Sequence, residues 1–239
     1  MTTHLVSLCL DAHDPDRLGQ FWAGVLRREL VRDADGDLLA PADVPELPMY
    51  FVPTREPRTG PNQTHLHLTS ISADDQQATV DRVLRLGGQH LDVGQLPEEG
   101  HVVLADPEGN EFCVIEPGNA FLADTGFLGE LACDGTRAVG QFWSEALGWP
   151  LVWDQDEETA IQSPHGGAKI AWGGPPVREK TGKNRFHLDI APPADGDLGT
   201  EVDRLISLGA SRIDIGQGDV PWVVMADPGG NEFCVLPPR

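Results

Sequence analysis

The sequence is poor in basic residues and has no long hydrophobic run. Of its 239 residues, 17 are Lys or Arg and 38 are Asp or Glu, which gives a formal net charge of −21. This balance argues against nucleic acid and against an anionic membrane surface as partners, because both require clustered Lys and Arg. No apolar run approaches the length of a membrane span. The first residues, MTTHLVSLCLDAHD, also lack a basic region followed by an apolar one, so we expect a cytoplasmic protein.

Cysteine is scarce as well, and its spacing excludes a structural zinc site of the usual kind. The four cysteines are Cys9, Cys113, Cys133 and Cys234, and none of them forms a CxxC pair. A cytoplasmic protein keeps such thiols reduced, so we expect four free thiols. We interpret Cys113 and Cys234 as small buried apolar groups. The alternative, a reactive nucleophile, would need a cationic neighbour that the sequence does not reveal.

What the chain does contain is a long internal repeat. His101–Pro117 and Trp222–Pro238 are identical at twelve of seventeen positions, and Val80–Gln95 and Val202–Gln217 share eight of sixteen. A repeat of this period is a whole domain rather than a solenoid unit of 20–50 residues. We therefore predict an N-terminal domain over 1–117, a linker over 118–126 and a C-terminal domain over 127–239.

Each half alternates strand signals with two amphipathic helices, which predicts an α+β fold. In the first half, Asp14 and Pro15 begin a helix whose apolar positions recur at i, i+3, i+4 and i+7. A second helix is expected over 75–86, and Asp106–Gly109 has the signature of a type I turn between two closing strands. The inward positions predicted for the four helices include Leu18, Phe21, Trp22, Val25, Leu26, Val80, Val83, Leu84, Val139, Phe142, Trp143, Leu205 and Ile206.

This order of elements, together with the FW pair of the first helix and the DPEGNEFCV hairpin, resembles the vicinal oxygen chelate superfamily. That superfamily includes glyoxalase I, bleomycin-resistance proteins, fosfomycin-resistance enzymes and extradiol dioxygenases, and the chain is most similar to its glyoxalase-like members. The resemblance implies two tandem domains, each of two βαβββ modules that curl into a cup with helices on the convex side. In metal-dependent members, His, Gln and Glu on the first and last strands bind a metal ion, whose open positions take vicinal oxygens of the substrate.

The family pattern can be carried onto this chain from fixed landmarks. The first-strand ligand lies fourteen residues before the Phe of the FW pair, and the last-strand ligand lies seven residues after the Asp of DPxGN. The matching positions are Ser7, Tyr50, His65 and Cys113 in the first half and Leu128, Trp172, His187 and Cys234 in the second. Leu and Trp do not coordinate metals, so we predict no metal cofactor. The alternative that stays open is a divalent metal in the N-terminal domain, held by His65, His67 and Cys113.

Strand alternation predicts which side chains face the concave side of each cup. Glu111, Cys113 and Ile115 should share that face, as should His65 with His67 and His187 with Asp189. Aromatic walls would favour a ring-containing ligand, although the same aromatics could instead fill the cup as core. The predicted ligand-binding residues are Ser7, Tyr50, His65, His67, His101, Glu111, Cys113, Trp172, His187, Asp189, Trp222 and Cys234.

The function expected from these residues is metal-independent binding of a small molecule, such as an aromatic or drug-like metabolite, in the manner of bleomycin-resistance proteins. The alternative is a lyase, isomerase or dioxygenase-like enzyme with acid–base or metal-assisted chemistry in the N-terminal domain. In that case His65 or His67 would be the catalytic proton carrier. The expected partner is a small-molecule ligand, and the expected assembly is a monomer or a homodimer.

Overall fold

A computed structural model describes residues 3–32, 36–41, 45–96 and 98–239 of the chain. Each half contains two modules, and each module is a strand, a helix and three further strands. The first module consists of β1 (His4–Ala12), α1 (Pro15–Leu26), β2 (Leu30–Arg32), β3 (Asp37–Leu39) and β4 (Met49–Pro53). The second consists of β5 (Thr64–Leu68), α2 (Ala73–Arg85), β6 (Gln89–His90), β7 (Val102–Ala105) and β8 (Glu111–Val114).

The second half repeats the same order of elements. The third module consists of β9 (Leu128–Cys133), α3 (Arg137–Leu147), β10 (Leu151–Gln155), β11 (Glu158–Gln162) and β12 (Lys169–Trp172). The fourth consists of β13 (Phe186–Ala191), α4 (Leu198–Ser207), β14 (Ser211–Arg212), β15 (Val223–Ala226) and β16 (Glu232–Val235). Within the described part of the chain, no helix has the length and apolar character needed to cross a membrane.

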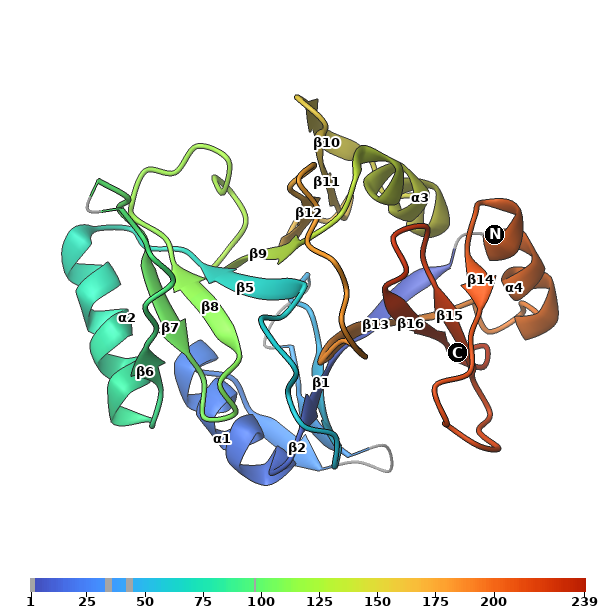
Figure 1. The fold of residues 1–239 in the computed structure, drawn as a ribbon, viewed down its shortest axis with the longest axis horizontal. Coiled ribbons are helices and arrows are strands. Elements are labelled where there is room, and N and C mark those ends of the chain that lie inside the picture. The colour runs from blue at the N-terminus through green and yellow to red at the C-terminus, as the bar shows by residue number, and fades with distance from the viewer. Residues whose placement is uncertain (1–2, 33–35, 42–44, 97) are drawn as a thin grey trace.

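The four modules form two eight-stranded sheets, and each sheet takes one module from each half (Figure 1). Sheet A joins the first and fourth modules in the order β14-β15-β16-β13-β1-β4-β3-β2. Sheet B joins the second and third modules in the order β10-β11-β12-β9-β5-β8-β7-β6. The modules meet through antiparallel pairs, β1 with β13 and β5 with β9. The α+β class and the tandem arrangement of βαβββ modules are confirmed.

This pairing corrects one expectation, namely that the candidate residues of one half would gather in one cup. Ser7 lies on β1 of sheet A, whereas His65 lies on β5 of sheet B. Each first strand has one edge paired within its own module and one edge open to another module. All four modules offer the same open edge, so the repeat itself does not indicate which modules pair.

The helices largely follow the apolar pattern of the sequence. α1 begins after Asp14, whose side chain accepts a hydrogen bond from Arg17 N at 3.1 Å. Its predicted inward residues are all buried. The predictions for Leu84 and Ile206 are wrong, because these side chains are 38% and 42% exposed. Each lies one position beyond the last buried residue of its helix face, where the helix surface turns toward solvent.

The DPxGN motif is a structural turn that fastens each closing hairpin to a helix. Asp106 accepts hydrogen bonds from the backbone N–H groups of Glu108 and Asn110, both at 2.9 Å, and from Trp22 Nε1 at 3.3 Å. In the second half, Asp227 accepts the matching bonds from Gly229 N, Asn231 N and Trp143 Nε1. The FW pair and the DPxGN turn therefore recur together because they bond to each other.

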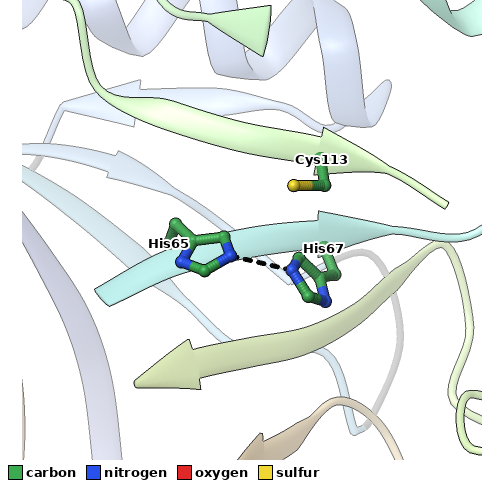
Figure 2. Close-up of side chains that lie close together, drawn as sticks. All are labelled: His65, His67 and Cys113. Atoms are coloured by element: carbon green, nitrogen blue, oxygen red, sulfur yellow. Dashed lines mark hydrogen bonds between the residues drawn. The ribbon is translucent and has the colours of Figure 1, made fainter. Parts of the chain in front are cut away.

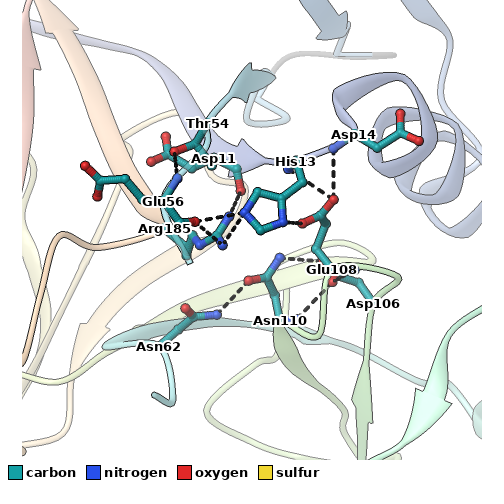
Figure 3. A network of polar contacts seen from close by, with 10 residues as sticks. All are labelled: Asp11, His13, Asp14, Thr54, Glu56, Asn62, Asp106, Glu108, Asn110 and Arg185. Carbon is teal, nitrogen blue, oxygen red and sulfur yellow. Dashed lines mark hydrogen bonds and ion pairs between the residues drawn. The ribbon is translucent and has the colours of Figure 1, made fainter. Parts of the chain in front are cut away.

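A polar network joins the two sheets beside the first of these turns (Figure 3). Arg185, just before β13, donates to the carbonyl oxygens of Asp11 and Glu56, at 3.1 Å each. His13 Nε2 lies 2.8 Å from the same Glu56 oxygen. Glu108 accepts from the backbone N–H of His13 at 3.1 Å. Because Glu108 lies in the turn between β7 and β8 of sheet B and Arg185 leads into β13 of sheet A, the network fixes the two sheets against each other.

Candidate functional site

The candidate site is a hollow on one face of sheet B, with a volume of about 430 Å³. It lies over β5, β9, β11 and β12 and is bordered by the linker between the two halves. A hollow of this size suits a small molecule. We call it the sheet-B hollow, and it is lined by His65, His67, Phe121, Glu130, Ala132, Cys133, Asp134, Trp153, Glu158, Thr159, Ala171, Trp172 and Gly173.

Three side chains at this hollow form a continuous hydrogen-bonded row. His67 Nδ1 lies 2.7 Å from Glu130 Oε2, and His67 Nε2 lies 2.9 Å from His65 Nε2. The Glu130 side chain is 9% exposed and that of His67 is 19% exposed, so the ion pair is shielded from solvent. Figure 2 shows the two rings on β5 with Cys113 on the neighbouring strand. Cys113 is directly opposite His67 in the register of β5 and β8.

The two histidines have opposite tendencies to hold a proton. Burial and, to a smaller extent, the charge of the nearby His67 together lower the pKa of His65 to about 3. Burial alone would also lower the pKa of His67, but the neighbouring Cys113 and the hydrogen-bonded carboxylate of Glu130 outweigh this and raise it to about 9. At neutral pH, His67 is therefore an imidazolium and His65 is neutral.

These charge states fix the tautomer of His65. An imidazolium donates from both nitrogens, so His67 donates to Glu130 through Nδ1 and to His65 through Nε2. His65 Nε2 must then be the acceptor, and its proton is on Nδ1. Among the described residues, no hydrogen bond engages His65 Nδ1. The row therefore ends in one free N–H donor at the hollow.

Both histidines were predicted from the sequence, but Glu130 was not. Counting from the FW pair gave Leu128, two residues too early, and the pairing of β5 with β9 shifts register at this point, between His67 and Leu68. Glu130 is directly opposite His67 in that pairing. A signal was present, because Glu130 is a single charge inside the apolar strand LGELAC. A charge in a buried strand requires a partner on a neighbouring strand.

The aromatic wall of the hollow is formed by Trp153 and Phe121, which the sequence analysis did not name. Their rings meet edge to face with centroids 5.7 Å apart. Lys169 Nζ is 4.4 Å from the centre of the Phe121 ring, and it also donates to the Phe121 carbonyl oxygen. Trp172 borders the hollow, but it is only 2% exposed and packs into the core against the α3 residue Gly140. The Trp172 ring is therefore part of the core, as in the alternative interpretation of the aromatic residues.

Glu111, on β8 of sheet B, and His101, just before β7, do not line the hollow. The Glu111 carboxylate is engaged by Arg58 Nη2 at 2.6 Å and by the backbone N–H of Asn62 at 3.0 Å. Its twin Glu232 accepts in the same way from Lys180 and from Asn184 N. Both glutamates anchor the loops between modules. His101 precedes β7, and its carbonyl oxygen accepts from Gln95.

The other predicted residues lie with sheet A, apart from this hollow. Ser7 and Cys9 of β1 are next to Asp189 and His187 of β13 in the strand register. They form a second polar set on that sheet, which Cys234 joins from β16. Tyr50 is paired with Cys9 across β1 and β4. Trp222 precedes β15 and is 37% exposed.

Both sheets contain residue types that bind metals. His65, His67 and Cys113 place their ligand atoms within 4.8 Å of one another, as do Cys9, His187 and Asp189. Two imidazoles and a thiol suit a transition metal such as zinc, and a carboxylate behind a histidine is a common outer partner in such sites. The sheet-B set therefore fits a cation by donor type. In its hydrogen-bonded state, however, His67 would have to lose a proton before it could coordinate.

Comparison with known proteins places this geometry in a family. A family model described as a glyoxalase-like domain matches residues 7–115 and again 130–236. Glyoxalase I from Zea mays has the same fold with a TM-score of 0.65 and 14% identity, over 99% of this chain and 92% of that protein. A putative dioxygenase from Bacillus subtilis matches with a TM-score of 0.61 and 14% identity, over 99% and 85%.

At such low identity these structures establish the fold and leave the chemistry open. Among curated proteins, no sequence matches the chain. The two matched ranges fall within the two predicted domains and together include every residue of the two polar sets. The chain belongs to the glyoxalase-like domain family and carries two such domains in tandem.

Proposed function

We propose that the protein binds a small, ring-containing molecule in the sheet-B hollow and holds an acceptor oxygen of that molecule on His65 Nδ1. The observation that carries the proposal is the row of Glu130, His67 and His65. Both ring nitrogens of His67 are engaged within the row, and His65 keeps its second ring nitrogen for a ligand. A preorganised donor beside an apolar wall is the usual composition of a small-molecule site.

The walls favour a flat ligand of modest size. Trp153 and Phe121 present ring surfaces on which an aromatic group can stack. Opposite them, Ala132 and Ala171 leave room above the sheet because their side chains are short. The oxygen acceptor would be a carbonyl, phenol or phenolate, since each accepts a hydrogen bond from a neutral imidazole. In this proposal, the row of Glu130, His67 and His65 binds the ligand without a metal ion.

A thermal-shift screen of aromatic metabolites and antibiotics, run with and without EDTA, tests the proposal. We expect a ligand that raises the melting temperature equally in both arms. His65→Ala should weaken its binding about tenfold, which is the value of one hydrogen bond. The matched control is His187→Ala, the same change on sheet A, which should leave the affinity unchanged. A ligand insensitive to His65→Ala, or lost with His187→Ala, would contradict the proposal.

The same row favours one second candidate, an enzyme of the lyase or isomerase type. His65 would pass its Nδ1 proton to a substrate oxygen while its Nε2 takes the proton of His67, and Glu130 would stabilise His67 throughout. Under this reading His65→Ala abolishes turnover of the screened ligand instead of only weakening binding. If a divalent metal takes part, His65, His67 and Cys113 would hold it and it would polarise the substrate oxygen. EDTA would then abolish the activity.

A further inference from the structure

Sheet A carries a second polar set, formed by Cys9, His187 and Asp189. Cys9 is directly opposite His187 in the pairing of β1 and β13, and Asp189 lies two residues further along the same strand face. Their ligand atoms all lie within 4.8 Å of one another. Cys9 is 3% exposed and Asp189 is 9% exposed, so the set is almost completely removed from solvent.

Unlike the row in sheet B, this set does not satisfy its own polar atoms. Asp189 Oδ2 accepts from the Cys9 thiol at 3.1 Å and from Ser7 at 3.4 Å. Asp189 Oδ1 is buried without a hydrogen-bond partner, and so is His187 Nδ1. His187 Nε2 and Asp189 Oδ1 face each other at 3.6 Å, which is longer than a hydrogen bond. A buried carboxylate oxygen left without a donor is costly, and a cation beside it would remove that cost.

The donor types narrow the class of cation. A thiol sulfur, an imidazole nitrogen and a carboxylate oxygen together suit zinc and similar transition metals, whereas Mg²⁺ and Ca²⁺ prefer oxygen ligands throughout. Cys234 is opposite Asp189 in the register of the neighbouring strands β13 and β16, where it can orient that carboxylate.

We propose that Cys9, His187 and Asp189 form a site for a transition-metal ion of the zinc class. The set differs from the one that the family pattern indicates for these strands, which uses Ser7, His187 and Cys234. Both Cys9 and Asp189 lie two residues beyond the family positions. The ion replaces the thiol proton of Cys9, so one proton is released for each thiolate–metal bond formed. The site consists of sheet-A residues and does not depend on the function proposed for sheet B.

Cobalt is the probe for this site, because a Co²⁺ ion bound by a thiolate has a strong near-ultraviolet band that oxygen and nitrogen ligands alone do not give. The full chain carrying Cys113→Ala is used as the parent, which removes the thiol of the sheet-B set. After treatment with chelator, we expect this protein to take up one Co²⁺ with the thiolate band, and Zn²⁺ to displace it. Adding Cys9→Ala should abolish the band and weaken Co²⁺ binding more than a hundredfold.

Two further variants make the result decisive. Cys133→Ala, which removes a thiol outside both sets, should leave the band unchanged. Asp189→Asn keeps the size of the side chain and should weaken Co²⁺ binding while the melting temperature in EDTA stays near that of the parent. It decides the matter if the Cys9 variant fails to fold. The proposal is overturned if the parent binds neither Co²⁺ nor Zn²⁺, or if the thiolate band survives Cys9→Ala, or if Asp189→Asn leaves binding unchanged.

Discussion

The polar sets of the two sheets occupy matched places but are completed in different ways. Where sheet B has Glu130 on β9, sheet A has Cys9 on β1, and where sheet B has His67, sheet A has Asp189. In sheet B the carboxylate faces an imidazole, which is a strong donor, and both are satisfied. In sheet A the carboxylate faces thiol and hydroxyl groups and keeps one oxygen without a donor.

The comparison shows how a duplicated fold can acquire two kinds of site. In each sheet the strand register brings four side chains together at matched positions. They are His65, His67, Cys113 and Glu130 in sheet B and Cys9, His187, Asp189 and Cys234 in sheet A. In sheet B the carboxylate is on the β1-type strand and belongs to a hydrogen-bonded row; in sheet A it is on the β5-type strand and belongs to a set of ligand atoms with unpaired members.

The largest effect is expected where the halves are alike, in the DPxGN turns. Asp106→Ala leaves several buried donors without an acceptor, including Trp22 Nε1, and should cost about 4 kcal/mol of unfolding free energy. Asp227→Ala should cost a similar amount, because Trp143 and the turn amides bond to it in the same way. Urea unfolding of the two variants checks this. A difference of several kcal/mol between them would mean that the turns are not equivalent.

The second prediction concerns pH and tests the sheet-B row. The pKa of His67 is raised to about 9 from an ordinary value near 6.5, so its charge stabilises the fold below pH 6.5. That stabilisation is lost as the pH rises from about 6.5 through 9, and it amounts to about 3 kcal/mol. Urea unfolding across this range measures it.

Two variants isolate the contribution of the row. Glu130→Gln removes the negative partner of His67 and should flatten the alkaline loss. His13→Gln, at an exposed histidine that pairs with Glu108, should leave the loss in place. An unchanged alkaline slope in the Glu130 variant would show that the row does not hold the proton.

A smaller effect is expected at the wall of the hollow. Trp153→Ala should weaken a ligand found by the thermal-shift screen about tenfold, because one stacking surface is lost. Trp222→Ala removes a half-exposed tryptophan at the edge of sheet A and should not change the affinity. Isothermal titration calorimetry distinguishes the two. Equal losses in both variants would place the ligand elsewhere.

The smallest effect is expected where the two turns differ, at Glu108 and Gly229. Glu108 accepts from the backbone N–H groups of His13 and Asp14 at the start of α1, whereas Gly229 has no side chain to do so. Glu108→Gly copies the second turn into the first and should cost about 1 kcal/mol. Thermal unfolding of the Glu108→Gly variant measures this cost. Glu116→Gly is the control for replacing a glutamate by glycine.

Much of the fold was predictable because it depends on local patterns. The helix faces, the turn at Asp106 and the alternation of His65 with His67 follow from periodicity and turn chemistry. The pairing of the two outer modules with each other, and of the two inner modules with each other, was not predictable, since all four modules present the same open edge. The partner of His67 was missed for a related reason. Glu130 acts across a strand pair, and the count along the chain stopped at Leu128, where the register of that pair shifts.

The free donor on His65 Nδ1 depends on the proton that His67 holds in the sheet-B row. Nitrogen-15 NMR of the histidine side chains, in protein treated with EDTA, measures it directly. We expect His67 to be protonated on both nitrogens at pH 7 and to titrate near 9, and His65 to be neutral with its proton on Nδ1. Two rings that both titrate near 6.5, the ordinary value for histidine, would contradict it.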